Sequence, residues 1–279
     1  MNYKLKSFAD SVENFQCPIC KKTVEIQGNS LICGNKHCFD FSKHGYINLL
    51  LKSKPQMNYD KQSFENRNQV LEGGMYEGIL EKIVQFILST SSIKNILDVG
   101  CGEGFYSRQL YQKTNKNIFA FDLSKDAIQI ASKKDKCGAI KWFVTDLSKI
   151  PLKNGSMDCI LDIFSPAHYK EFHRILSPHG YIIKVIPTEN HLKEIRVKAK
   201  EFLKNPDYSN QSVIEYFEKN LEIVSRETVS QTIQLSPEQR NAFLEMTPLL
   251  FHVEKDNIIW DTMTHLTIEA EILIGTFSK

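Results

Sequence analysis

The stretch that decides the fold of this chain is NILDVGCGEG, residues 95–104. An apolar strand expected at 95–99 runs directly into three glycines spaced G-x-G-x-G. Glycines at such a turn let the backbone approach a ligand closely, and the start of the next helix offers unpaired N–H donors. Many α/β folds turn sharply here, so the loop alone is weak evidence for a nucleotide site. The segments around it carry the rest of the prediction.

Those segments alternate between strand and helix patterns. Apolar residues at helical spacing predict a helix at 74–88, before the loop. Downstream, short apolar strands alternate with helices, which predicts an α/β fold whose parallel sheet is covered on both faces. The strands are expected at 118–121, 142–144, 158–164 and 181–186, and the helices at 126–133 and 170–176, with a turn at 178–180.

The two ends of the chain differ from this rhythm. A helix is expected to begin at Ser236, which would cap it, with Pro237 in the first helical position. Residues 266–276 alternate like antiparallel strands, and the polar residues 51–68 predict a linker or mobile loop. We therefore expect three units, which are a cysteine-rich module at 1–52, a linker and helix at 53–93, and the sheet domain at 94–279.

Three acidic side chains stand where strands of this sheet are expected to end: Asp98, Asp122 and Asp146. The carboxyl ends of parallel strands meet at one edge of the sheet. There Asp122 can accept hydrogen bonds from a ribose diol, and Asp146 can meet an adenine amino group. Each acid alone is equally well explained as a turn or capping residue, but together they favour an adenosyl ligand.

The loop favours S-adenosylmethionine over a dinucleotide. Phe105 stands where the third glycine of G-x-G-x-x-G would be. The carboxylates of Asp98 and Glu103 would repel a pyrophosphate, whereas they suit a sulfonium and an ammonium group.

Four of the seven cysteines crowd into residues 17–38. Cys17 and Cys20 form one Cys-x-x-Cys knuckle, and Cys33 begins a second that either His37 or Cys38 completes. Paired knuckles present thiolates to a tetrahedral zinc ion, and four protein ligands make a site structural. The sequence therefore predicts one structural zinc in a zinc-ribbon-like hairpin, and free buried thiols are the less favoured alternative.

Composition sets the remaining limits. The 279 residues are 42% hydrophobic and 24% charged, with no apolar run near the roughly 20 residues of a membrane span. No membrane partner and no secretory leader are expected, which favours the cytoplasm. Residues 1–60 hold eight lysines against five acids. This mildly basic piece fits a polyanion, or equally a set of solvated lysines.

Taken together, these motifs resemble a known family. DVGCGEGF at 98–105, FDLS at 121–124 and PLKNGSMD at 151–158 are similar to class I S-adenosylmethionine-dependent methyltransferases. CPIC at 17–20, FDFSKHGYINLL at 39–50, GMY at 74–76 and EMTP at 245–248 narrow the resemblance to the RlmA family of large-subunit rRNA guanine-N1 methyltransferases. The resemblance covers nearly the whole chain.

The resemblance implies a Rossmann-like doubly wound class I methyltransferase sheet with a small N-terminal zinc module. It implies methyl transfer to guanine N1 in a hairpin loop of 23S rRNA, and for some members an influence on macrolide-type antibiotic sensitivity. It also implies a homodimer, which nothing in the composition requires. Zinc ligation by three Cys and one His selects His37 over Cys38. The implied S-adenosylmethionine contacts are Tyr76, Tyr106, Ser107 and His191, beside Asp98, Gly100, Gly102, Gly104, Asp122 and Asp146.

The loop at 164–168 would receive the acceptor base. Phe164 is the candidate to stack on a guanine, and Asp162 or His168 is the candidate base for the N1 proton, although an acid at a strand edge explains Asp162 equally well. Two alternatives stay open. One is a methyltransferase acting on a small molecule. The other is a catalytically silent zinc-ribbon module that docks RNA or protein.

Overall fold

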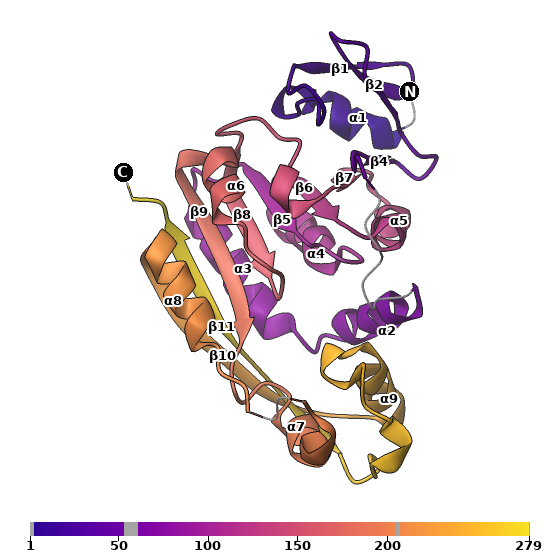
Figure 1. The fold of residues 1–279 in the computed structure, drawn as a ribbon, viewed down its shortest axis with the longest axis vertical. Helices are drawn as coiled ribbons and strands as arrows, with labels where there is room; N and C mark the ends of the chain where they lie inside the picture. The colour runs from indigo at the N-terminus through magenta and orange to yellow at the C-terminus, as the bar shows by residue number, and fades with distance from the viewer. Residues whose placement is uncertain (1–2, 53–60, 205–206, 279) are drawn as a thin grey trace.

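In the residues that this computed structural model describes, 3–52, 61–204 and 207–278, eight strands form one sheet in the order β10-β11-β9-β8-β5-β6-β7-β4 (Figure 1). Neighbours from β4 to β9 run parallel, whereas β11 is antiparallel to both of its neighbours, β9 and β10. The bounds are β4 Tyr46–Asn48, β5 Asn95–Val99, β6 Asn117–Asp122, β7 Lys141–Val144, β8 Met157–Ile163, β9 Leu176–Pro187, β10 Glu222–Gln234 and β11 His265–Thr276. The predicted doubly wound α/β fold is confirmed.

Helices cover both faces of this sheet because its central strands are apolar on both sides. Ile96 of β5 packs in one core with helices α3, α4 and α5, and the next residue, Leu97, packs in a second core with α1, α6 and α8. The helix bounds are α1 Tyr3–Ala9, α2 Lys61–Glu72, α3 Glu77–Ser89, α4 Phe105–Thr114, α5 Lys125–Lys134, α6 Tyr169–Ile175, α7 Lys193–Ala199, α8 Gln211–Asn220 and α9 Pro237–Met246.

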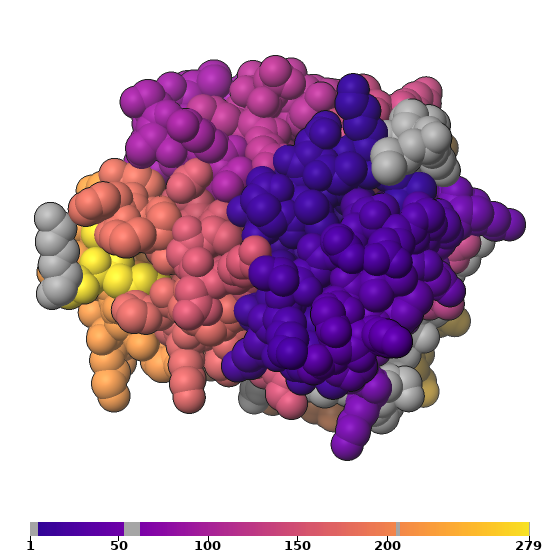
Figure 2. All heavy atoms as spheres, turned by 90° about the horizontal axis from the view of Figure 1, so that it is seen from above, coloured from indigo at the N-terminus to yellow at the C-terminus, as the bar shows by residue number. Residues whose placement is uncertain are grey.

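The cysteine-rich module is a ribbon of three short antiparallel strands, β1 Val24–Gln27, β2 Ser30–Cys33 and β3 Cys38–Asp40. The predicted hairpin is therefore confirmed. The chain then enters the main sheet, because β4 pairs in parallel with β7. From above, the N-terminal residues gather on one side of the molecule, beside the central part of the chain (Figure 2). The described part of the module, residues 3–52, is thus tied to the sheet by one of its edge strands.

Two predictions differ from the structure. Part of the predicted linker at 51–68 is the start of α2, and residues 53–60 lie outside the described part of the chain. This polar segment is helical because Phe64, Val70 and Leu71 are buried, with α2 packed against α9 (Figure 1). The predicted turn at 178–180 lies inside β9, whose pairing with β8 is irregular between Met157 and Cys159.

The C-terminal third completes the sheet. Ser236 caps α9 through a capping box with Gln239, and β11 pairs antiparallel with both β9 and β10, so both predictions are confirmed. The sequence analysis missed α7, α8 and β10. The side chains of β10 are mostly exposed, so the strand lacks the apolar signal of the buried ones.

Candidate functional site

The glycine loop joins β5 to α4 at the carboxyl edge of the sheet. Gly100, Gly102 and Gly104 have φ values of +63°, +56° and +77°, in the left-handed region that side chains other than glycine rarely adopt. The carboxylate of Asp122, at the end of β6, accepts hydrogen bonds from the N–H of Gly102 at 2.9 Å and from that of Ser124 at 2.8 Å. Asp122 therefore ties the loop to the neighbouring strand.

Gly104 is required by packing. A Cβ atom there would lie 2.4 Å from the Trp142 indole and 2.9 Å from Cβ of Ala131. The glycine lets α4 start directly against β7 and α5. Its predicted contact with the cofactor stays a prediction, because this close approach alone accounts for the residue.

Two buried carboxyl groups border the loop. Asp98 accepts a hydrogen bond from the Ser107 hydroxyl at 2.5 Å. Burial raises the pKa of Asp98 to about 7, although the bond from Ser107 lowers it. Glu103 is 1% exposed, and within the described residues neither of its carboxylate oxygens has a hydrogen-bond partner. Its Oε2 atom forms an ion pair with the Nε atom of Arg67 at 3.7 Å.

These groups fit the methionyl end of S-adenosylmethionine. The hydroxyl of Tyr106 is also buried and lacks a hydrogen-bond partner in the described part of the chain. Buried polar atoms normally have partners, so the orphaned oxygens of Glu103 and Tyr106 indicate a ligand that supplies donors. An ammonium group does so, and buried carboxylates favour a cation electrostatically. Glu103 was recognised in the sequence as an acid inside the loop but not as a site residue.

A cavity of about 410 Å³ opens beside the loop. Four predicted residues line it: Tyr76, Tyr106, Phe164 and His191. The rings of Tyr76 and Phe164 meet edge to face with centroids 5.9 Å apart, and the His191 ring lies 5.7 Å from Phe164 and 6.1 Å from Tyr76. Phe164 has a φ of +52°, a strained conformation for a bulky residue and one that clusters at functional sites.

His191 is a neutral member of this group. Burial and the neighbouring guanidinium of Arg196 lower the pKa of His191 to about 4. Its Nδ1 atom accepts a hydrogen bond from the N–H of Glu269 at 3.3 Å. The imidazole thus presents a flat, uncharged face to the cavity at neutral pH.

The cavity also contains cations that the sequence analysis missed. Arg67 comes from α2, Lys184 from β9 and Arg196 from α7. No sequence signal marked Arg67, because its segment was predicted to be a linker. Lys184 lies within a predicted strand, but only the pairing of neighbouring strands shows which side chains it meets.

Three of the predicted residues that do not line the cavity have other partners: Asp146, His168 and Asp162. Asp146 caps a 3₁₀ turn at 147–149, accepting the Ser148 N–H at 2.9 Å, and His168 caps α6, accepting the Glu171 N–H at 3.2 Å. Asp146 therefore has the capping role that was its alternative, and His168 has a capping role that was not predicted. Asp162 is fully buried and paired with Lys184. The contact of Asp146 with adenine and the role of His168 as a base stay predictions.

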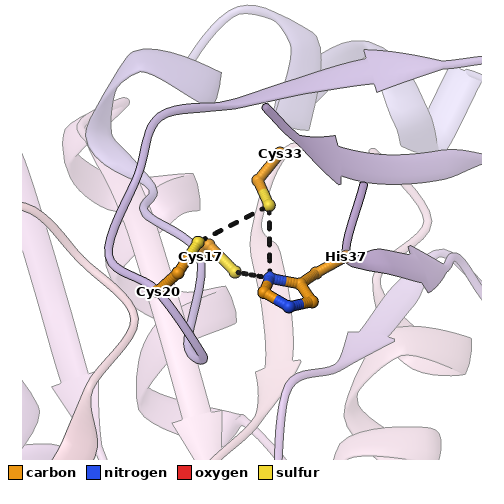
Figure 3. Close-up of side chains that lie close together, drawn as sticks. All are labelled: Cys17, Cys20, Cys33 and His37. Carbon is orange, nitrogen blue, oxygen red and sulfur yellow. Dashed lines mark hydrogen bonds between the residues drawn. The ribbon is translucent and has the colours of Figure 1, made fainter. Parts of the chain in front are cut away.

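The structure brings Cys17, Cys20, Cys33 and His37 together, and their ligand atoms all lie within 4.8 Å of one another (Figure 3). The Sγ atoms of Cys17 and Cys33 each lie 3.4 Å from Nδ1 of His37, and those of Cys20 and Cys33 lie 3.7 Å apart. A tetrahedral zinc site with Zn–S bonds of about 2.3 Å separates its sulfur ligands by about 3.8 Å. The exposed Cys38 lies outside this cluster, near Asp40. The chemistry and spacing fit one zinc ion.

A doubly wound sheet, a glycine loop flanked by buried acids and an adjoining cavity define a class I S-adenosylmethionine-dependent methyltransferase, here with a zinc ribbon. Residues 96–180 match the family described as "Methyltransferase domain", and residues 15–54 match "RlmA, N-terminal". A chain of the solved complex between the Haloferax volcanii Trm112 methyltransferase activator and a methyltransferase has the same fold. Its TM-score is 0.50 at 15% identity, over 79% of this chain and 99% of that one.

Full-length relatives narrow the class. The YxjB protein of Bacillus subtilis (strain 168), provisionally named a 23S rRNA (guanine-N(1)-)-methyltransferase, is 34% identical over 94% of this chain and 96% of its own. The Streptomyces fradiae "23S rRNA (guanine(748)-N(1))-methyltransferase" is 25% identical over 88% and 89%. The chain belongs to the RlmA-type 23S rRNA (guanine-N1)-methyltransferase family. Among the described residues, no helix has the length and apolar character to span a bilayer.

Proposed function

We propose that this enzyme transfers a methyl group from S-adenosylmethionine to N1 of a guanine in a hairpin loop of 23S rRNA. The observation that carries the proposal is Phe164, held at a φ of +52° so that its ring meets Tyr76 and His191 in a cavity beside the glycine loop. Strained backbone persists where the surroundings enforce it. Here it presents an aromatic face at the point where an acceptor base would enter.

We assign the cofactor to the edge of the sheet beside this cavity. Asp122 would accept hydrogen bonds from the ribose, and the carboxyl groups of Asp98 and Glu103 would stabilise the cationic end. The remaining predicted contacts complete the set: Gly100, Gly102, Gly104, Tyr76, Tyr106, Ser107, Asp146 and His191. When bound, S-adenosylmethionine supplies a methyl group on a positively charged sulfur.

The residues of the chain then have to position the base. Guanine N1 lies on the pairing edge, so the target must leave any helix, as an unpaired loop allows. Stacking on Phe164 would hold the ring plane, and in-line transfer needs N1 about 3–3.5 Å from the methyl carbon. Tyr76 and His191, which both contact Phe164, would limit the orientations that the guanine ring can take. Stacking is worth about 1–3 kcal/mol for each base.

We assign RNA docking to the zinc ribbon. Cys17, Cys20, Cys33 and His37 would hold the zinc and fix the hairpin, whose lysines at 21, 22, 36 and 43 are all exposed. Exposed lysines can bind phosphates. Phe41 and Tyr46 are buried and belong to the core, so they do not serve as stacking platforms. A cytoplasmic location and a homodimer are parts of the same proposal. Light scattering of the purified enzyme tests whether it is a dimer.

The test is methyl transfer from labelled S-adenosylmethionine to unmodified 23S rRNA, with mass spectrometry of the digested nucleosides. We expect 1-methylguanosine, and fragments of the rRNA would locate it in a hairpin loop. Phe164→Ala should lower the methylation rate about 10- to 100-fold at unchanged cofactor affinity. The matched control Phe164→Tyr keeps the aromatic ring and should retain most of the wild-type rate. Cofactor binding without RNA methylation would refute the proposal and favour a small-molecule acceptor.

A further inference from the structure

A buried ion pair lies at the wall of the cavity. Lys184 of β9 is 3% exposed, and its Nζ atom donates to Oδ2 of Asp162 at 2.8 Å and to the carbonyl oxygen of Ser165. Lys184 lines the cavity, whereas the fully buried Asp162 does not. The positive member of the pair is therefore the one that borders the cavity.

Each oxygen of the buried Asp162 carboxylate accepts a hydrogen bond from the protein, and Asp162 does not line the cavity. Its Oδ1 accepts from the Ser165 hydroxyl at 2.6 Å, and its Oδ2 is held by Lys184. A general base must come within hydrogen-bond reach of the proton it takes, directly or through one water. Asp162 is therefore placed to position and charge-balance Lys184.

Lys184 also lies next in sequence to a residue that bonds Phe164, the side chain proposed to stack on the guanine. The N–H of Phe164 donates to the carbonyl oxygen of Val185 at 3.0 Å, which fixes the start of the acceptor loop on β9 one residue from Lys184. A base stacked on Phe164 would thus have the ammonium group near its edge.

We propose that Lys184 stabilises the negative charge that the guanine carries on O6 when N1 loses its proton. This inference rests on the proposed function. The N1 proton passes to hydroxide from the solvent, and the electron pair left behind is shared by N1 and O6. That pair forms the N1–CH₃ bond as the S–CH₃ bond breaks, and its electrons return to sulfur. A fixed cation in a nearly dry site favours the anion before transfer.

Other groups also titrate near this site. The charged and titratable side chains lining the same cavity are Arg67, Tyr76, Tyr106, His191, Arg196 and Tyr208. Tyr169 of α6 interacts electrostatically with Asp162 from outside the lining. Their contributions are common to all Lys184 variants, so a comparison of variants isolates the ammonium group.

The experiment measures single-turnover 1-methylguanosine formation on 23S rRNA between pH 6 and 10, with cofactor affinity measured in parallel. Lys184→Met should lower the rate constant about 100-fold at neutral pH, and the rate should keep rising with pH beyond the point where wild type levels off. Lys184→Arg should retain the plateau. Asp162→Asn keeps the ammonium group and should lose less activity than Lys184→Met.

The double variant Asp162→Asn/Lys184→Met guards against misfolding, because it leaves no unpaired buried charge. It should reproduce the pH profile of Lys184→Met. A Lys184→Met profile parallel to that of wild type, or an Asp162→Asn variant slower than Lys184→Met, would overturn the inference. If wild type itself forms no 1-methylguanosine, the proposed function is rejected and this inference falls with it.

Discussion

The carboxylate of Asp122 accepts a hydrogen bond from the backbone N–H of Gly102 at 2.9 Å. The acid at the end of β6 therefore holds the glycine loop that follows β5. Under the proposed cofactor assignment, loop geometry and cofactor affinity depend on this one side chain.

This relationship predicts the effect of Asp122→Ala. We expect the affinity for S-adenosylmethionine to fall at least about tenfold, because losing hydrogen bonds to a charged acceptor costs about 1.5–3 kcal/mol. Asp122→Asn keeps one acceptor oxygen for the loop, so its affinity for S-adenosylmethionine should fall less. Isothermal titration calorimetry measures both, and wild-type affinity in Asp122→Ala would refute the assignment.

Gly104 predicts a stability effect. Gly104→Ala should lower the free energy of unfolding by about 3 kcal/mol, since its Cβ would lie 2.4 Å from Trp142 in addition to the cost of a positive φ. Gly155 is the matched control. It has a φ of +63° with nothing within 4 Å of an added Cβ, so Gly155→Ala should cost only about 1 kcal/mol. Urea denaturation compares them, and equal losses would show that packing at Gly104 adds nothing.

The zinc cluster predicts a difference between two adjacent residues. His37→Ala should weaken zinc binding more than about 100-fold, because the cluster loses one of four ligands. Cys38→Ser should keep one zinc per chain, because the exposed Cys38 lies outside the cluster. Metal analysis after dialysis against a weak chelator distinguishes them. Loss of zinc from Cys38→Ser would show that Cys38, and not His37, is the fourth zinc ligand.

Asp98 predicts a pH dependence. Burial raises its pKa from 3.8 to about 7, so below pH 7 the side chain is neutral in the ligand-free protein. A cationic ligand favours the ionised form, so affinity for S-adenosylmethionine should rise about tenfold for each pH unit below 7 and level off above it. The same shift makes the ligand-free fold more stable at low pH. This contribution is fully present below pH 3.8 and is lost as the pH rises from there through 7.

The measurement for Asp98 is calorimetric titration in buffers of different ionisation enthalpy at pH 6, where wild type should release a proton on binding. Asp98→Asn is the control and should release fewer protons. Equal proton release by the two proteins would contradict the role given to Asp98.

Much of the candidate site could be predicted because its signals are local. The apolar strand before Gly100 and the knuckle at Cys17 and Cys20 each specify backbone geometry within a few residues. Tyr76 and His191 came from resemblance alone, since nothing local separates them from an ordinary packed Tyr and a surface His. The structure places both in the cavity.

Other residues could not be assigned from local pattern. Asp146 and His168 carry side chains suited to chemistry, yet Asp146 caps a 3₁₀ turn and His168 caps helix α6. Such a cap depends on backbone N–H groups becoming available at a helix start. Helix α2 was missed because its few apolar residues are buried against α9, about 170 residues further along the chain.

The linear sequence thus determined the α/β alternation, the glycine loop and the zinc ligand types, because short-range periodicity and spacing suffice for them. Only the tertiary structure selected His37 over Cys38 by geometry, brought Arg67 to Glu103 and paired Lys184 with Asp162. The physical reason is register. A side chain's partner across a parallel sheet is set by the alignment of strands about 20 residues apart, and a shift of one residue would turn Lys184 to the opposite face.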